Sequence, residues 1–184
     1  MRDCLLLVDV FNDFGHEDGA RLLASFQSRL PALRQLLANA RAAEIPVVYA
    51  NDSSEVFDGD AGAIVERARS GAAAALIAEI QPLAGDRFVI KPRYSAFDST
   101  PLALILAELN IERILLAGLS TEGCVAQTAI AAKELGYKVT VVPAACATVD
   151  EELEQIALAY LTRVVGVVAE DAPLLLRHPR VGRE

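Results

Sequence analysis

The sequence contains no tryptophan, one methionine, two histidines and three cysteines in 184 residues. The cysteines (Cys4, Cys124 and Cys146) are odd in number and have no Cys-x-x-Cys spacing, which argues against a disulfide framework or a structural zinc site. A reducing, cytoplasmic location is therefore the simpler expectation. His16 and His178 are too few and too far apart in the sequence to favour a Cys–His catalytic pair.

Basic charge and long apolar runs are also missing. The net charge of −8 and the pI near 4.8 argue against a surface that binds nucleic acid. No segment approaches about 18 uninterrupted apolar residues, so no membrane span is expected. The apolar run that begins at Leu5 meets Asp9, Asn12 and Asp13, too early for a signal peptide.

The chain does have enough apolar residues, 53%, to fill the core of one domain over residues 1–184. Six runs rich in Val, Ile and Leu are continuous rather than alternating, which is typical of strands buried on both faces. These predicted strands are Cys4–Val10, Ile45–Ala50, Arg87–Ile90, Arg113–Ala117, Lys138–Val142 and Arg163–Val168.

Helical patterns lie between the predicted strands. Apolar residues recur at i, i+3, i+4 and i+7 from Leu33 to Ala40 and again from Leu102 to Leu109. Alternating strands and helices predict an α/β fold of three layers, with a mainly parallel sheet covered on both faces. Residues 52–72 are the least regular stretch and predict a surface excursion.

Four predicted strands end in polar or reactive residues. Asp9 ends the first strand, Asn51 and Asp52 the second and Lys91 the third, and the Cys124 loop follows the fourth. Ligands of open α/β sheets bind outside the carboxyl ends of the strands. These side chains are therefore expected at one edge of the sheet.

Cys124 is the candidate nucleophile. It lies in the first turn of a predicted helix over Thr121–Leu135, where free N–H groups and the helix dipole favour a thiolate. Lys91 could supply a cation, and Asp9 could take the thiol proton and return it to a leaving amine. Backbone N–H groups of the turn from Ser120 to Cys124 could hold an oxyanion.

Each residue also has a structural interpretation. Cys124 could be a small apolar filler, as many free cysteines are. Asp9 could cap a turn together with Asn12, and Lys91 could be an ordinary exposed lysine.

Three segments in order resemble the isochorismatase-like cysteine hydrolases. LLVDVFNDF (6–14) resembles their first strand and loop, and KPRYSAFDSTPL (91–102) resembles their lysine segment. GLSTEGCVAQTA (118–129), followed by GYKV (136–139), resembles their nucleophile segment. The match spans roughly residues 4–150.

The resemblance implies a six-stranded parallel sheet and a catalytic triad of Asp9, Lys91 and Cys124. It also implies a cis peptide bond between Leu119 and Ser120, which turns the N–H of Ser120, with that of Cys124, toward the oxyanion. Members hydrolyse small amides, carbamoyl groups or related C–N bonds, and usually form homodimers or homotetramers.

Departures from the family pattern bear on the substrate. Nicotinamidases of this family hold a metal with an Asp and two His residues after the second strand, where this chain has Asn-Asp-Ser-Ser (51–54). We therefore expect no metal or other cofactor, and nicotinamide is disfavoured. Isochorismate-hydrolysing members lack the cysteine, so Cys124 argues against that reaction. Phe11 stands where family members commonly carry Gln. Pro-Ala-Ala (143–145) stands where an Asp-Ala pair is usual in the family.

The leading hypothesis is a metal-independent cysteine hydrolase that cleaves a C–N bond of a small amide or carbamoyl compound through a thioester. The alternative is a non-catalytic small-molecule-binding or interaction protein on the same fold. A dinucleotide-dependent oxidoreductase is weaker, because no Gly-x-Gly-x-x-Gly follows the first strand. The expected pocket walls are Phe14, Asn51, Tyr94, Phe97 and Val125.

Overall fold

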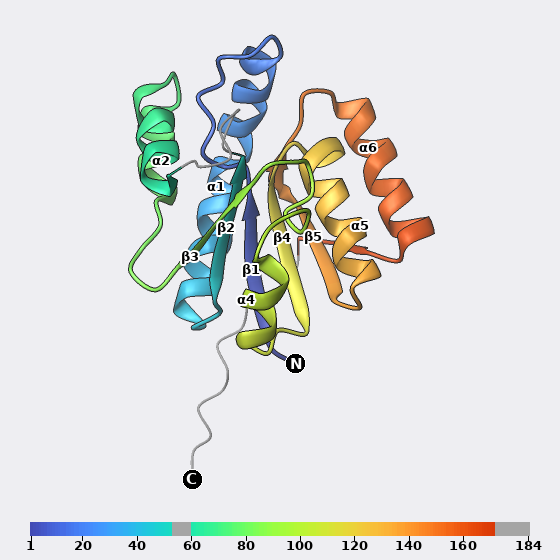
Figure 1. The fold of residues 1–184 in the computed structure, drawn as a ribbon. Coiled ribbons are helices and arrows are strands. Elements are labelled where there is room, and N and C mark those ends of the chain that lie inside the picture. The colour runs from blue at the N-terminus through green and yellow to red at the C-terminus, as the bar shows by residue number, and fades with distance from the viewer. Residues whose placement is uncertain (53–59, 172–184) are drawn as a thin grey trace.

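The computed structural model describes residues 1–52 and 60–171, which form a single six-stranded sheet with helices on both faces (Figure 1). The strand order is β3-β2-β1-β4-β5-β6 and every neighbouring pair is parallel. The predicted α/β fold is therefore confirmed. The strands are β1 Asp3–Val8, β2 Val47–Asp52, β3 Arg87–Lys91, β4 Arg113–Leu119, β5 Lys138–Ala147 and β6 Val168–Ala169.

Helices follow the strands in the order expected of crossover connections. The patterns seen in the sequence at 33–40 and 102–109 lie in α1 and α4. The helical elements are α1 Gly19–Ala42, α2 Ala61–Ser70, α3 Ala74–Ile77, η1 Ala78–Ile80, α4 Leu102–Glu108, η2 Thr121–Val125, α5 Ala126–Glu134, α6 Glu151–Tyr160 and η3 Leu161–Val165.

The two central strands are the most deeply buried part of the molecule. In β1, Cys4–Val8 is wholly inaccessible to solvent, and in β4 Ile114–Ala117 is equally buried. Such strands have no solvent-facing side, so their sequences run continuously apolar rather than alternating. The carboxyl ends of β1 and β4, which lie side by side, are where polar residues first appear.

The prediction of a sixth strand over Arg163–Val168 is wrong for most of these residues. The helix of α6 continues through η3 to Val165, and Gly166, with φ of 77°, ends it in the left-handed conformation. Only Val168 and Ala169 pair with β5. The run of valines has strand propensity, but buried Leu161 holds this turn in the helix, and the packing decides the outcome.

The expectation of an irregular stretch over 52–72 is also wrong for Ala61–Ser70, which forms α2. The side chain of Asp60 accepts a hydrogen bond from the N–H of Gly62 and caps the helix. Ile64 and Ala68, one turn apart, are buried and hold it against the core. Residues 53–59 lie outside the described part of the chain.

The helix predicted over Thr121–Leu135 is divided. η2 makes a wide turn in which Gly123 has non-helical φ and ψ of −107° and −105°, and regular helix begins only at Ala126. Cys124 therefore lies in a turn that precedes α5. None of the helices in the described ranges has both the length and the apolar character needed to cross a bilayer.

Candidate active site

The structure brings Asp9, Lys91 and Cys124 into contact. Asp9 directly follows β1, Lys91 is the last residue of β3, and Cys124 lies in η2 just after β4. Because all three strands are parallel, their carboxyl ends lie at the same edge of the sheet. Asp9 and Lys91 are 82 residues apart in the sequence, and Lys91 and Cys124 are 33 apart. The fold brings them together.

Lys91 contacts both other members. Its side chain is fully buried, and its ammonium group donates to Asp9 Oδ2 at 2.8 Å, to the backbone oxygen of Arg93 at 2.9 Å and to Cys124 Sγ at 3.4 Å. An ammonium group has three N–H donors, so these contacts use all of them. Lys91 is therefore held as a fixed cation beside the sulfur, and the exposed-lysine interpretation is wrong.

Asp9 is held from two sides. Its Oδ1 accepts a hydrogen bond from the backbone N–H of Asp52 at 2.8 Å, and its Oδ2 accepts one from the ammonium of Lys91 at 2.8 Å. The backbone of Asp9 has φ of 53°, a left-handed conformation that non-glycine residues adopt rarely and often at functional sites. Its carboxylate thus meets the ammonium that also contacts the sulfur of Cys124.

The protonation state of the site follows from its burial. Burial and the negative charge of Asp9 raise the pKa of Cys124 to about 12, against the opposing effect of Lys91. Burial would lower the pKa of Lys91, but Asp9 and Cys124 outweigh it and raise that pKa. Burial also raises the pKa of Asp9. These shifts favour a neutral thiol at Cys124 over the thiolate that its position before a helix suggested.

The turn that carries Cys124 is closed by two backbone hydrogen bonds. The backbone oxygen of Ser120 accepts from the N–H groups of Gly123 at 3.1 Å and Val125 at 3.2 Å. The peptide bond between Leu119 and Ser120 is cis, as predicted. The role of the Ser120 and Cys124 N–H groups as an oxyanion hole stays a prediction.

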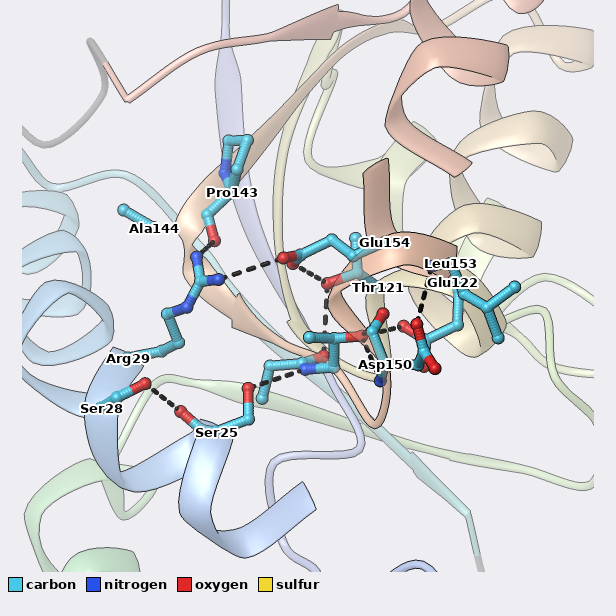
Figure 2. A network of polar contacts seen from close by, with 12 residues as sticks. Ser25, Ser28, Arg29, Thr121, Glu122, Pro143, Ala144, Asp150, Leu153 and Glu154 are labelled. Carbon is cyan, nitrogen blue, oxygen red and sulfur yellow. Dashed lines mark hydrogen bonds and ion pairs between the residues drawn. The ribbon is translucent and has the colours of Figure 1, made fainter. Parts of the chain in front are cut away.

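A buried polar network supports the first residue of this turn (Figure 2). Thr121, which is inaccessible to solvent, donates to Glu154 Oε1 of α6 at 2.8 Å. Glu154 Oε2 accepts from Arg29 of α1 at 3.0 Å, and Arg29 also donates to the backbone oxygen of Pro143 at 3.0 Å. The turn of η2, which carries the candidate nucleophile Cys124 and which we call the nucleophile turn, is therefore tied to α6, α1 and β5.

Glu122 forms a second branch of the network. Its carboxylate accepts from the hydroxyl of Thr148 at 2.8 Å and from the N–H of Val149 at 3.1 Å. The N–H of Thr148 in turn donates to the hydroxyl of Ser25 at 3.0 Å. Sequence reasoning missed both branches, because an Arg and a Glu 125 residues apart carry no local signal.

A cavity of about 620 Å³ opens onto Asp9 and Cys124. A neighbouring cavity of about 480 Å³ shares Asp52, Tyr94 and Cys124 with it and also reaches Lys91. Both lie at the carboxyl edge of the sheet, as expected. The larger cavity is lined by Asp9, Phe11, Asn12, Asp13, Gly15, His16, Asp18, Leu22, Asn51, Asp52, Arg67, Tyr94, Leu119, Ser120, Cys124 and Val149.

Two of the five expected pocket walls line this cavity. Tyr94 is 63% exposed and lies between the two cavities, where a ligand would cover it. Asn51 is buried and holds the loop after β1, accepting from the N–H of Phe11 at 2.9 Å and donating to its backbone oxygen at 3.0 Å.

The other three lie outside the cavity lining. Phe14 packs against Phe26, with ring centres 5.6 Å apart, and Phe97 packs against Tyr137 at 6.0 Å. Val125 is fully buried, because it faces the core side of the nucleophile turn. Sequence reasoning missed Arg67 and His16, which line the cavity from α2 and the loop before α1.

The two departures from the family pattern differ in their position. Phe11 lines the cavity and stacks on Phe88, with ring centres 5.9 Å apart, so that corner is apolar. Ala144 lies in the irregular part of β5, where the pairing with β4 shifts register, and its N–H donates to Asp171 at 2.9 Å. The exchange at Ala144 therefore bears on strand geometry rather than on the cavity wall.

The residues at the second strand end do not fit the metal site expected of nicotinamidases. Within residues 1–52 and 60–171, no group of three or more His, Cys, Asp or Glu side chains is arranged to hold a metal. Asp52 is present, but Ser53 and Ser54 follow it in place of imidazole ligands, and these two lie outside the described residues.

Comparison with known proteins identifies the family. The family profile of the Isochorismatase domain matches residues 3–172, so the chain belongs to the isochorismatase family. An uncharacterized isochorismatase family protein of Bacillus subtilis, YaaI, is 30% identical over 161 residues, covering 88% of this chain and 89% of that protein. The resemblance seen in the sequence is thereby confirmed.

Other relatives have stated activities. The ureidoacrylate amidohydrolase RutB of Yersinia enterocolitica is 30% identical over 67% of this chain and 66% of its own length. The solved N-carbamoylsarcosine amidase of Thermoplasma acidophilum is 32% identical with a TM-score of 0.72, covering 92% of this chain and 96% of that one. A nicotinamidase of Staphylococcus aureus is 26% identical with a TM-score of 0.71, covering 92% and 100%.

Proposed function

We propose that this protein is a cysteine hydrolase that cleaves the C–N bond of a small amide or carbamoyl compound through a thioester on Cys124. Its family and its amide-hydrolysing relatives make it a hydrolase of non-peptide C–N bonds. The nucleophile and mechanism rest mainly on one observation: the buried ammonium of Lys91 contacts both the carboxylate of Asp9 and the sulfur of Cys124.

The first half of the reaction forms the thioester. As the sulfur of Cys124 attacks the carbonyl carbon, its proton passes to the carboxylate of Asp9, which meets the sulfur at the shared ammonium of Lys91. The raised pKa of Asp9 makes it a stronger base for this transfer. The tetrahedral intermediate then collapses, the C–N bond breaks, and Asp9 gives the proton to the leaving nitrogen.

The second half of the reaction hydrolyses the thioester and regenerates the free enzyme. Water attacks the thioester carbonyl while Asp9 takes one of its protons, and the C–S bond breaks to give the acid. The proton on Asp9 returns to the sulfur. Lys91 keeps its proton throughout and stabilises the thiolate whenever the sulfur lacks a proton.

Backbone donors stabilise the oxyanion in this proposal. The N–H groups of Ser120 and Cys124 lie in the closed turn at the cavity floor, and donors fixed in advance stabilise developing charge most effectively. The cavity of about 620 Å³ suits a small molecule. The ureido and carbamoyl substrates named for two relatives make a carbamoyl compound a reasonable first test.

The decisive measurement is release of ammonia or amine from a panel of small amides and carbamoyl compounds, followed by mass spectrometry of the protein for an acyl adduct. Wild-type protein should hydrolyse at least one compound, and Cys124→Ala should lose this activity by at least roughly a thousandfold. Thermal unfolding of both proteins controls for folding. Equal hydrolysis of a true substrate by wild type and Cys124→Ala would exclude the thioester route.

A second candidate is a non-catalytic small-molecule binder on the same fold. The raised pKa of Cys124, about 12, favours it, because little thiolate exists at neutral pH before a ligand binds. If the protein is a binder, some amides should bind and protect Cys124 from alkylation by iodoacetamide, although the protein never hydrolyses them.

A further inference from the structure

Two cavities meet at Cys124. The cavity of about 620 Å³, which we call the main cavity, reaches Asp9 and Ser120. The cavity of about 480 Å³, which we call the side cavity, reaches Lys91. Cys124 and Tyr94 line both of them. The candidate nucleophile therefore lies where the two cavities join, and a molecule bound to its sulfur can extend into each.

Gln127 presents an unpaired amide to the side cavity. It lies on α5, three residues after Cys124, and its side chain is exposed. Within residues 1–52 and 60–171 this amide makes no hydrogen bond to another protein group. Other polar groups of the same cavity are already used: Arg93 pairs with Asp98 at 3.3 Å, and the hydroxyl of Ser95 accepts from a backbone N–H at 3.2 Å. An amide is both donor and acceptor, so Gln127 can pair with a ligand group that is both as well.

The proposed mechanism decides which part of a substrate enters which cavity. The carbonyl carbon of an amide has three substituents in one plane, pointing to the corners of a triangle: the oxygen, the nitrogen and the acyl chain. The oxygen goes to the N–H groups of Ser120 and Cys124, and the leaving nitrogen goes to Asp9. Asp9 and Ser120 both line the main cavity. The acyl chain is therefore the substituent that points away from the main cavity, past Tyr94 and into the side cavity.

We propose that the side cavity is the acyl subsite of this hydrolase, and that Gln127 selects substrates whose acyl chain ends in an uncharged hydrogen-bonding group. This inference rests on the proposed function and adds the class of acyl group to it. Charge in the side cavity is largely matched within the protein, since Arg93 pairs with Asp98 and Lys91 with Asp9. A neutral amide or ureido group leaves these pairs intact and offers Gln127 both a donor and an acceptor.

Hydrolysis of two amides of the same shape tests the subsite. Succinamide ends in a second amide, isocaproamide has an isopropyl group in that place, and both release ammonia. Wild-type kcat/KM, divided by two for the equivalent amides of succinamide, should favour succinamide by at least roughly tenfold. Gln127→Leu should bring this ratio to about one. Glu134→Leu is the matched control, because Glu134 is exposed on the same helix outside both cavities, and it should keep the wild-type ratio.

Protection of Cys124 from iodoacetamide separates this inference from the proposed function, because protection requires binding but no hydrolysis. Succinamide should protect wild-type protein at a roughly tenfold lower concentration than isocaproamide, and Gln127→Leu should be protected equally by both. Equal binding of the two amides by wild type, an unchanged ratio in Gln127→Leu, or a preference for the charged analogue succinamate would overturn the acyl subsite. Protection with the expected preference but without hydrolysis would overturn the proposed function and support Gln127 as the group that binds the chain. Absence of both hydrolysis and protection would overturn both.

Discussion

At the scale of single residues, Asp9 has two opposing effects on Cys124. Together with burial, which is the larger cause, its negative charge raises the pKa of the Cys124 thiol, and in the proposed reaction its carboxylate is also the base that accepts the thiol proton. Lys91 acts in the opposite direction and favours the thiolate. In the proposed mechanism the thiol proton therefore moves to Asp9 during the attack rather than before it.

Asp9→Asn separates these two effects. Without the charge of Asp9, the pKa of Cys124 should fall, and alkylation by iodoacetamide at neutral pH should become faster. Hydrolysis of a confirmed amide substrate should fall by about 10²- to 10⁴-fold, the usual contribution of a general acid and base. Both rates are measured on the same protein, and Cys4 and Cys146 do not interfere because both are fully buried.

Asp13→Asn is the control for this variant, since Asp13 lines the same cavity but makes no contact with Cys124. It should leave the alkylation rate unchanged. Slower alkylation of Asp9→Asn would contradict the assigned cause of the raised pKa.

At the scale of elements, the site depends on how closely β1 and β4 approach. Gly118 of β4 has φ of 133°, and a Cβ atom there would lie 2.0 Å from the backbone oxygen of Val8. The register between β4 and β5 shifts at the same point, between Leu116 and Gly118. Asp9 directly follows Val8, and η2 begins three residues after Gly118, so the glycine sets the separation of Asp9 from η2.

Gly118→Ala should therefore destabilise the protein by about 3–5 kcal/mol, from backbone strain and from the clash with β1. Urea unfolding measures this loss. Gly85→Ala provides the comparison, because Gly85 has φ of 100° but nothing within 4 Å of the added atom, and should cost only about 1 kcal/mol. Equal losses in the two variants would show that the contact with Val8 is unimportant.

At the scale of the whole molecule, the nucleophile turn is supported by elements that are distant in sequence. Arg29 of α1 and Glu154 of α6 meet behind Thr121, and their side chains are 29% and 8% exposed. A partly buried ion pair of this kind is weak evidence for stability by itself, but removing one partner leaves the other charge uncompensated. Its position behind the turn indicates a role in holding Thr121.

Glu154→Gln should lower the free energy of unfolding by about 3 kcal/mol, because Arg29 loses its partner. It should also reduce kcat on a confirmed substrate more than it raises KM, since the turn, not the cavity wall, is affected. Glu151→Gln, an exposed neighbour on α6, should change stability by no more than about 0.5 kcal/mol. Unchanged unfolding of Glu154→Gln would show that Arg29 finds another partner.

Much of the fold was predictable because its signals are local. Runs of apolar residues predicted five of the six strands closely, and helical spacing predicted α1 and α4. The sixth strand was misassigned because β-branched residues at 164–168 favour a strand, whereas packing at Leu161 extends the helix. Pocket walls were only partly predicted, since Phe97 and Val125 can face the core or a ligand with the same sequence pattern.

The sequence by itself determined which residues stand at the carboxyl ends of parallel strands. Continuous apolar runs indicate the buried strands, and the polar residues that follow each run mark where the strand ends. Asp9, Lys91 and Cys124 follow from that pattern. Only the tertiary structure decided the direction in which the pKa of Cys124 shifts and the partners of Glu154. Both depend on burial and on charges brought together from distant segments, and electrostatic effects of that kind are set by distance in space rather than by position along the chain.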